Sequence, residues 1–133
     1  MCELGRPGVG ARFHDVEKVA GPLAALGIGF EENNPVTKLM VDRKKGLINP
    51  EVRNEKVLSA IVEFMIPAER LPEVLEVLDR VSQEIGTVFS GDIIARIGED
   101  GSVPYLKDIQ GRGRFLSING KSNLGLGRPL AAV

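Results

Sequence analysis

An amphipathic helix pattern between two apolar, strand-like segments, within residues 57–97, most constrains the fold of this chain. Over residues 68–85, aliphatic side chains recur three and four positions apart, which places them on one face of a helix. The members of this stripe are Leu71, Val74, Leu75, Leu78, Val81 and Ile85. Pro67 precedes the helix, Pro72 falls in its first turn, where a missing N–H costs little, and Gly86 provides a stop. The pattern predicts one helix.

The segments on either side of this helix alternate as strands do. In residues 57–66 every second side chain is apolar, and residues 87–97 repeat the pattern from Phe89 onward. A strand, a helix and a strand of these lengths normally form a crossover that joins two parallel strands of one sheet. The unit therefore predicts a sheet with at least one helix packed on it.

The amino-terminal half carries weaker patterns. Residues 15–26 have helical spacing with Asp15 as the expected N-cap, and Gly21-Pro22 predicts either a kink or two short helices. Residues 28–32 and 36–42 either pair as a hairpin or contribute only the second strand.

A strand at residues 9–13 would complete the order βαββαβ, although Gly8 and Gly10 disfavour it. We therefore expect an α+β protein, a two-layer sandwich of ferredoxin-like order. The length of 133 residues fits a single domain, 1–133, with a core at about 9–98 and an irregular Gly/Arg-rich C-terminal extension at 99–133. Element order by itself does not fix function.

The C-terminal extension is the first candidate for a binding site. Cations and glycines alternate there, and residues 109–133 contain no acidic side chain. Glycines let backbone N–H groups approach an anion, while Arg, Lys and Asn supply charge and donors. The expected anion-binding residues are Arg112, Arg114, Asn119, Lys121, Arg128, Gly111, Gly113 and Gly120. The alternative is a solvated tail whose glycines only make turns.

The sheet face opposite the helices is the second candidate. If the apolar faces of both strands pack on helices, charged and aliphatic side chains share the other face. These residues are Ile61, Glu63, Met65, Asp92, Ile94 and Arg96. A mixed face of this kind is an oligomer interface, a ligand floor or a wet surface.

Catalytic and metal chemistry has little support in the residue types present. His14, the only histidine, and the carboxylates Asp92 and Glu63 are the candidate acid or base groups of a small enzyme. Adjacent side chains at a helix start usually point apart, so we do not expect His14 and Asp15 to form a dyad. One cysteine and one histidine without ligand spacing predict no zinc site, and no cofactor signature is present.

Charge and cysteine usage bear on partners and location. With 17 Lys plus Arg and 18 Asp plus Glu, the chain has no overall field that would recruit nucleic acid or an anionic membrane. The single Cys2 and the lack of an apolar signal segment in residues 1–30 predict a cytoplasmic protein.

These features favour a non-enzymatic regulatory or assembly module. It would form a homo-oligomer through its open sheet face and bind an anionic small molecule or protein partner with the Gly/Arg stretch. The alternatives are a small enzyme acting on a phosphorylated or carboxylated metabolite, and a nucleic-acid-binding protein that uses Arg112-Gly113-Arg114-Phe115.

Overall fold

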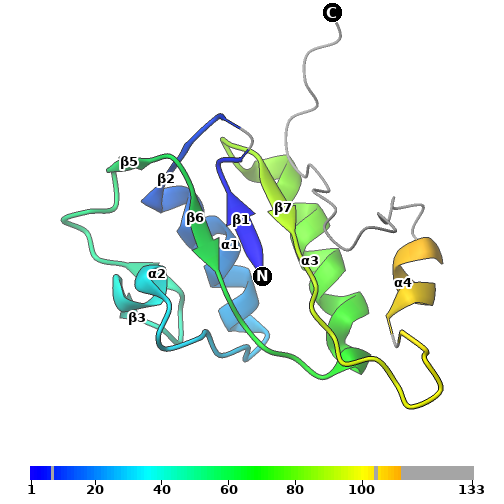
Figure 1. The fold of residues 1–133 in the computed structure, drawn as a ribbon. Coiled ribbons are helices and arrows are strands. Elements are labelled where there is room, and N and C mark those ends of the chain that lie inside the picture. Colours follow the sequence, from blue (N-terminus) through cyan, green and yellow to red (C-terminus); the bar gives the residue numbers. More distant parts are fainter. Residues whose placement is uncertain (7, 104, 112–133) are drawn as a thin grey trace, which may run out of the picture.

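A three-stranded antiparallel sheet lies at the centre of the protein, seen here in a computed structural model that describes residues 1–6, 8–103 and 105–111 (Figure 1). Its middle strand is β1 (Cys2–Leu4), and β6 (Ala60–Val62) and β7 (Phe89–Gly91) pair with its two sides. Since both outer strands run antiparallel to β1, they are parallel to each other. The strand–helix–strand prediction is confirmed in this respect, with β1 inserted between the two strands.

Two helices cover one side of this sheet. α1 (Phe13–Ala25) and α3 (Leu71–Glu84), the latter preceded by the 3-10 turn η1 (Ala68–Arg70), lie behind the strands in Figure 1. The predicted helix at residues 68–85 is thus confirmed, and the protein has an α+β fold. The sheet and the two helices share a core whose most buried members include Leu4, Val62, Phe89, Val16, Leu23 and Val74.

The two strands of the central unit are shorter than the alternating patterns predict. Residues 57–66 divide into β5 (Lys56–Val57), which pairs with β2 (Ala11–Arg12), and β6, which pairs with β1. The chain changes partner at Leu58, which is 90% exposed rather than buried. Within residues 87–97 the strand β7 ends at Gly91, and the backbone of the next residue, Asp92, exchanges hydrogen bonds with Met1.

The first strand of the sheet lies at Cys2–Leu4 and not at residues 9–13. Gly8 and Gly10 have φ values of +65° and +77°, and Gly10 N–H donates to the Gly5 carbonyl. Positive φ angles belong to turns. Residues 9–13 are therefore divided among a turn, the two residues of β2 and the start of α1.

Helix α1 begins two residues earlier than predicted and is a single helix through Pro22. Asp15 is not its N-cap. Its Oδ2 accepts a hydrogen bond from the Arg12 N–H at 3.0 Å, so it reaches back to the start of the helix from the third position. Burial of Val19 and Leu23, both 0% exposed, explains why tertiary packing outweighs the cost of the interior proline.

Residues 28–32 and 36–42 do not form a hairpin with each other. A four-residue helix, α2 (Pro35–Lys38), takes up the first part of the second segment. The rest of that segment contains β3 (Met40–Asp42), which pairs with β4 (Leu47–Ile48), inside the expected polar connection. Of the earlier segment only Phe30 forms a β-bridge, antiparallel to Phe64. The last described element is α4 (Leu106–Gly111). None of the helices in the described ranges could cross a bilayer.

Candidate ligand-binding pocket

Helix α3 carries apolar side chains on two sides. Val74, Val77, Leu78 and Val81 belong to the main core shared with α1 and the sheet. Leu71 and Leu75 instead form a second cluster with Ile109 of α4. Ile66, Ile93 and Tyr105 pack against this smaller cluster from the chain segments that follow β6 and β7 and from the start of α4. The second side of α3 is therefore covered by loosely connected segments.

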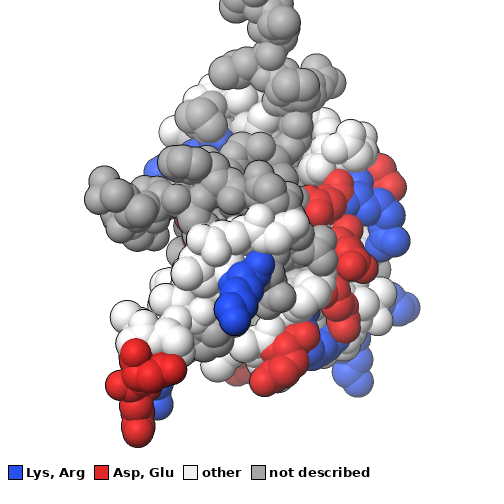
Figure 2. Space-filling view, turned by 90° about the vertical axis from the view of Figure 1, so that its right-hand side faces the viewer, with Lys and Arg blue, Asp and Glu red and all other residues white. Residues whose placement is uncertain are grey.

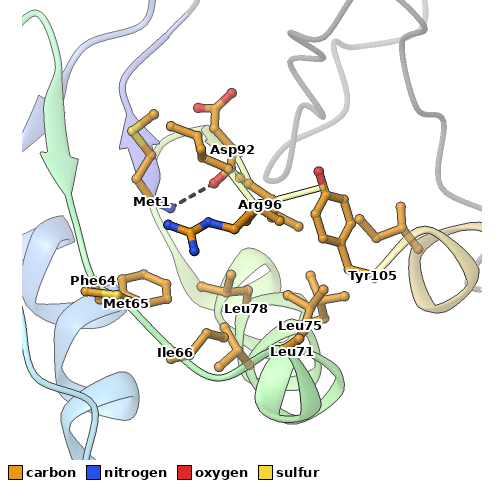
Figure 3. Close-up of a pocket in the computed structure, with 17 residues that line it drawn as sticks. Met1, Phe64, Met65, Ile66, Leu71, Leu75, Leu78, Asp92, Arg96 and Tyr105 are labelled. Carbon is orange, nitrogen blue, oxygen red and sulfur yellow. Dashed lines mark hydrogen bonds between the residues drawn. The ribbon is translucent and has the colours of Figure 1, made fainter. Parts of the chain in front are cut away.

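A cavity of about 420 Å³ lies beside Leu71 and Leu75 of α3 and extends to Val74 and Leu78, which also border the main core. Its floor is aliphatic, with Leu71, Leu75 and Leu78 pointing into it, and Phe64 and Tyr105 stand at its sides (Figure 3). Small-molecule pockets in proteins typically have volumes of 300–1,000 Å³ and mainly apolar walls with a few polar groups. The size and lining of this cavity are those of a small-molecule site.

Among the described residues, three polar side chains line the cavity: Asp92, Arg96 and Tyr105. The Arg96 guanidinium extends over the leucine floor, whereas the Asp92 carboxylate points away from it (Figure 3). The Met1 amino group donates to the Asp92 carbonyl at 2.8 Å, which ties the end of β1 to the segment after β7. Arg96 has neither an ion pair nor a hydrogen bond within the described ranges, so its charge is available to a ligand.

The described surface on the side of α3 and α4 has no dominant charge. Figure 2 views the molecule from this side and shows acidic and basic side chains mixed along one edge, beside side chains that carry no charge.

The predicted interface residues divide between two places. Met65, Asp92, Ile94 and Arg96 line the cavity, with Met65 88% and Ile94 89% exposed at its rim. Ile61 does not line it.

Ile61 lies on the outer face of the sheet, where β1 places it opposite Glu3, and Ser90 lies on the other side of Glu3. Glu63 accepts a hydrogen bond from the Asn34 Nδ2 at 2.6 Å, and Asn34 caps α2. Glu63 therefore anchors α2 and is not part of the cavity wall.

The predicted anion-binding stretch is mostly outside the described residues. Only Gly111, the last residue of α4, is described, and residues 112–133 are not. An edge strand, which the sequence would also allow at residues 115–118, lies outside the described ranges as well. Since Ile109 of α4 lines the cavity, the Gly/Arg stretch begins, at Gly111, two residues after a cavity-lining side chain.

The three candidate acid or base groups do not converge. Asp92 is at the cavity, Glu63 is bonded to Asn34, and His14 is in the first turn of α1 beside a different set of residues. The expectation that His14 and Asp15 point apart is wrong, because His14 Nδ1 lies 3.4 Å from Asp15 Oδ1. The structure thus supplies no catalytic pair at the cavity.

Sequence reasoning missed the cavity itself. The signal was present in α3, where Leu71 and Leu75 together with Val77 make the apolar surface wider than one stripe. Tyr105, the only tyrosine, and Ile109 gave no periodic pattern because α4 has only six residues. A wide apolar surface on a helix is evidence for a second packing partner.

The described residues hold no group of three or more potential metal ligands. Searches with protein-family models, curated proteins and solved structures found no match for this chain.

Proposed function

We propose that this protein is a non-enzymatic module that binds a small, mainly apolar molecule carrying one anionic group. The observation that supports this is the cavity of about 420 Å³ between α3 and α4. Its floor is aliphatic, and Arg96, which has no partner in the part of the chain that the structure describes, lies over it. Burying the apolar part of a ligand would supply most of the binding free energy, at roughly 25 cal/mol per Å². Arg96 would select for a carboxylate or phosphate at one end.

The three methionines of the chain allow a direct test. Met1 and Met65 line the cavity, while Met40 lies in β3 and is 8% exposed. Decanoate should shift the methyl NMR signals of Met1 and Met65 and leave Met40 unchanged. Shifts at all three methionines, or at none, would rule out the cavity as the binding site.

Arg96→Gln tests the role of the charge. We expect this variant to bind decanoate about three- to tenfold more weakly, and to bind decanol as the unmodified chain does. Arg80→Gln on the exposed side of α3 removes the same charge away from the cavity and serves as the control. Equal weakening by the two substitutions would indicate a general charge effect.

Leu75→Phe tests the cavity itself. A larger ring in the floor reduces the space available and should weaken decanoate and decanol together. If the binding of both probes is unchanged, the ligand does not occupy this space.

The Gly/Arg stretch belongs to the same proposal. It begins at Gly111, directly after the α4 residues that line the cavity, so Arg112 and Arg114 could add cations to the anionic end of the ligand. Arg112→Ala with Arg114→Ala should then weaken decanoate but not decanol. If the affinity for decanoate is unchanged, the Gly/Arg stretch is not part of the site.

We further propose that the fold is ferredoxin-like. Its support is the order β6-β1-β7 with helices between successive strands, and the Phe30–Phe64 bridge, which places a fourth segment beside β6. In this reading Phe30 marks the second strand of the βαββαβ order.

We propose separately that the chain self-associates through the exposed face at the rim of the α3–α4 cavity. Met65 and Ile94 are 88% and 89% exposed there, and two such side chains on one face favour contact with a second copy. Sedimentation velocity should show a dimer that Met65→Lys with Ile94→Lys converts to a monomer. Leu58→Lys, at a residue 90% exposed outside this face, should leave the dimer intact. A monomeric unmodified chain at tens of micromolar would refute the proposal.

A further inference from the structure

The α3–α4 cavity lies in line with β1, at the middle position of the three-stranded sheet. In the register of this sheet, Cys2 is opposite Val62 of β6 and Gly91 of β7. Met1 lies one residue further, where its backbone exchanges hydrogen bonds with Asp92. The segments that follow β6 and β7 run on past Met1, and both line the cavity (Figure 3). The cavity therefore occupies the place that a strand continuing the line of β1 would take.

The segment after β7 directs unpaired backbone groups toward the cavity. It contains no helix, turn or bend from residue 92 to residue 98, so every second residue points its N–H and C=O groups to the same side. Asp92 bonds on the β1 side, to Met1. Ile94 and Arg96 follow on that side, and their backbone groups have no hydrogen-bond partner within the described ranges.

The segment after β6 does the same from the opposite side of the cavity. The Glu63 carbonyl accepts from the Glu31 N–H at 2.9 Å, on the side away from β1. The N–H and C=O groups of Phe64 and Ile66 therefore face the cavity, and neither residue has a backbone partner in the part of the chain that the structure describes. Unpaired backbone groups cost free energy at an apolar site, so the cavity has two edges that favour the addition of a strand.

The side chains around this position have the arrangement that an added strand requires. β1 directs Cys2 and Leu4 into the core, and a strand in line with it would direct every second side chain onto the leucine floor of the cavity in the same way. Its other side chains would lie on the outer face between Met65 and Ile94, which are 88% and 89% exposed at the rim. A bound strand would cover both of these exposed side chains.

We propose that the ligand of the α3–α4 cavity is a short extended peptide with a free C-terminal carboxylate, bound as a strand in line with β1. This inference rests on the function proposed above and names the ligand class of the same site. The peptide runs in the direction of β1, so it is antiparallel to both flanking segments and its carboxylate lies at the β1 end of the cavity. The Arg96 guanidinium extends over the floor toward that end and pairs with the carboxylate (Figure 3).

Two peptides of one composition test the strand register. N-acetyl-Thr-Val-Thr-Val, with a free carboxylate, places both valines on the leucine floor, whereas N-acetyl-Val-Thr-Val-Thr places both threonines there. We expect the first peptide to bind about tenfold more tightly in calorimetry, because only its apolar side chains are buried. N-methylation of both valines removes the donors to the Phe64 and Ile66 carbonyls and should weaken the first peptide by about tenfold. Equal affinities of the two peptides, or no effect of methylation, would overturn the proposal.

Amide hydrogen exchange, followed by NMR, tests the backbone pairing. The bound peptide should slow exchange about tenfold at Phe64, Ile66, Ile94 and Arg96 and leave Ala95, whose N–H points to the other edge, unchanged. Decanoate cannot form this ladder and should not produce the pattern. Equal slowing by decanoate would indicate exclusion of water instead of strand pairing. Slow exchange at the four amides without peptide would mean that the chain itself or a second copy fills the position. Either result would overturn the proposal.

The carboxylate is tested with the C-terminal amide of the same peptide. The amide should bind about three- to tenfold more weakly than the acid. Arg96→Gln should remove this difference, and Arg80→Gln, on the exposed side of α3, should keep it. A difference that survives Arg96→Gln would refute the pairing with the carboxylate. If decanoate binds the cavity and the peptide does not, the peptide proposal alone is refuted. If neither probe binds, the proposed function is refuted as well.

Discussion

The two apolar sides of helix α3 differ sharply in how they are packed. On the side toward α1 and the sheet, Val81 is 2% exposed and Phe89 is fully buried. On the side toward α4, Leu71 and Leu75 meet Ile109 and still leave a cavity of about 420 Å³. One helix therefore contributes both to a filled core and to a space that side chains do not fill.

The difference reflects what covers each side. The first side is covered by a 13-residue helix and a hydrogen-bonded sheet, which interdigitate at high density. The second is covered by a six-residue helix and by chain segments without ladder hydrogen bonds. Stability resides in the first side, and space for a ligand in the second, as expected where function departs from ideal packing.

The largest expected difference between the two sides of α3 is the loss in free energy of unfolding when a large apolar side chain is replaced by alanine. Phe89→Ala should lower the free energy of unfolding by about 3–5 kcal/mol, since it leaves a cavity in a filled core. Leu75→Ala should cost about 1–2 kcal/mol, because its side chain already borders empty space and loses fewer contacts. Urea denaturation measures both. Equal costs would show that the two sides are packed alike.

Substitution of Gly46 tests how closely the β3–β4 hairpin packs against α1. The φ of Gly46 is +66°, and an added Cβ would lie 2.6 Å from the Ala20 carbonyl carbon. Gly46→Ala should therefore cost about 3 kcal/mol, from strain and from displacement of the hairpin. Gly27 has a φ of +75° but open space around it, so Gly27→Ala should cost about 1 kcal/mol from strain alone. Similar losses for both glycines would contradict the close approach.

The sequence predicted the filled side better than the open one. The 68–85 helix and the parallel relation of its flanking strands followed from periodicity, because long apolar patterns average out local exceptions. The central strand β1 could not be predicted in this way, because its three residues, Cys2 to Leu4, are too few to show a periodic pattern.

The site predictions had a different outcome. Met65, Asp92, Ile94 and Arg96 were predicted as an interface and line the cavity, but they lie beyond the ends of β6 and β7, so alternation along a strand does not account for their position. The contribution of α4 to the cavity depends on contacts between residues distant in the chain, and the approach of His14 to Asp15 depends on side-chain rotamers. No rule of residue spacing predicts either.

The buried thiol of Cys2, in β1, should make the free energy of unfolding depend on pH in alkaline solution. Burial raises the pKa of the Cys2 thiol from 9.0 to about 12, so above pH 9 the unfolded chain loses a proton that the folded one keeps. The free energy of unfolding should then fall by about 1.4 kcal/mol per pH unit above pH 9, in addition to any other titration.

Cys2→Ala isolates this effect. The difference in unfolding free energy between the unmodified chain and Cys2→Ala should shrink by about 2 kcal/mol from pH 9 to 10.5. A difference that stays constant over this range would mean that the thiolate is tolerated in the fold.

The smallest expected effect concerns the polar contact that anchors α2 at the end of β6. Asn34 Oδ1 accepts from the Val36 N–H at 2.8 Å, and its Nδ2 donates to Glu63. Asn34→Ala should cost about 1 kcal/mol through loss of the cap, whereas Glu63→Gln, which keeps an acceptor, should cost less than about 0.5 kcal/mol. Neither residue lines the α3–α4 cavity, so decanoate should bind both variants as it binds the unmodified chain. Weaker decanoate binding in either variant would show that the anchoring of α2 and the open side of α3 are coupled. We do not expect this coupling, because α2 and the cavity lie on opposite sides of the filled core.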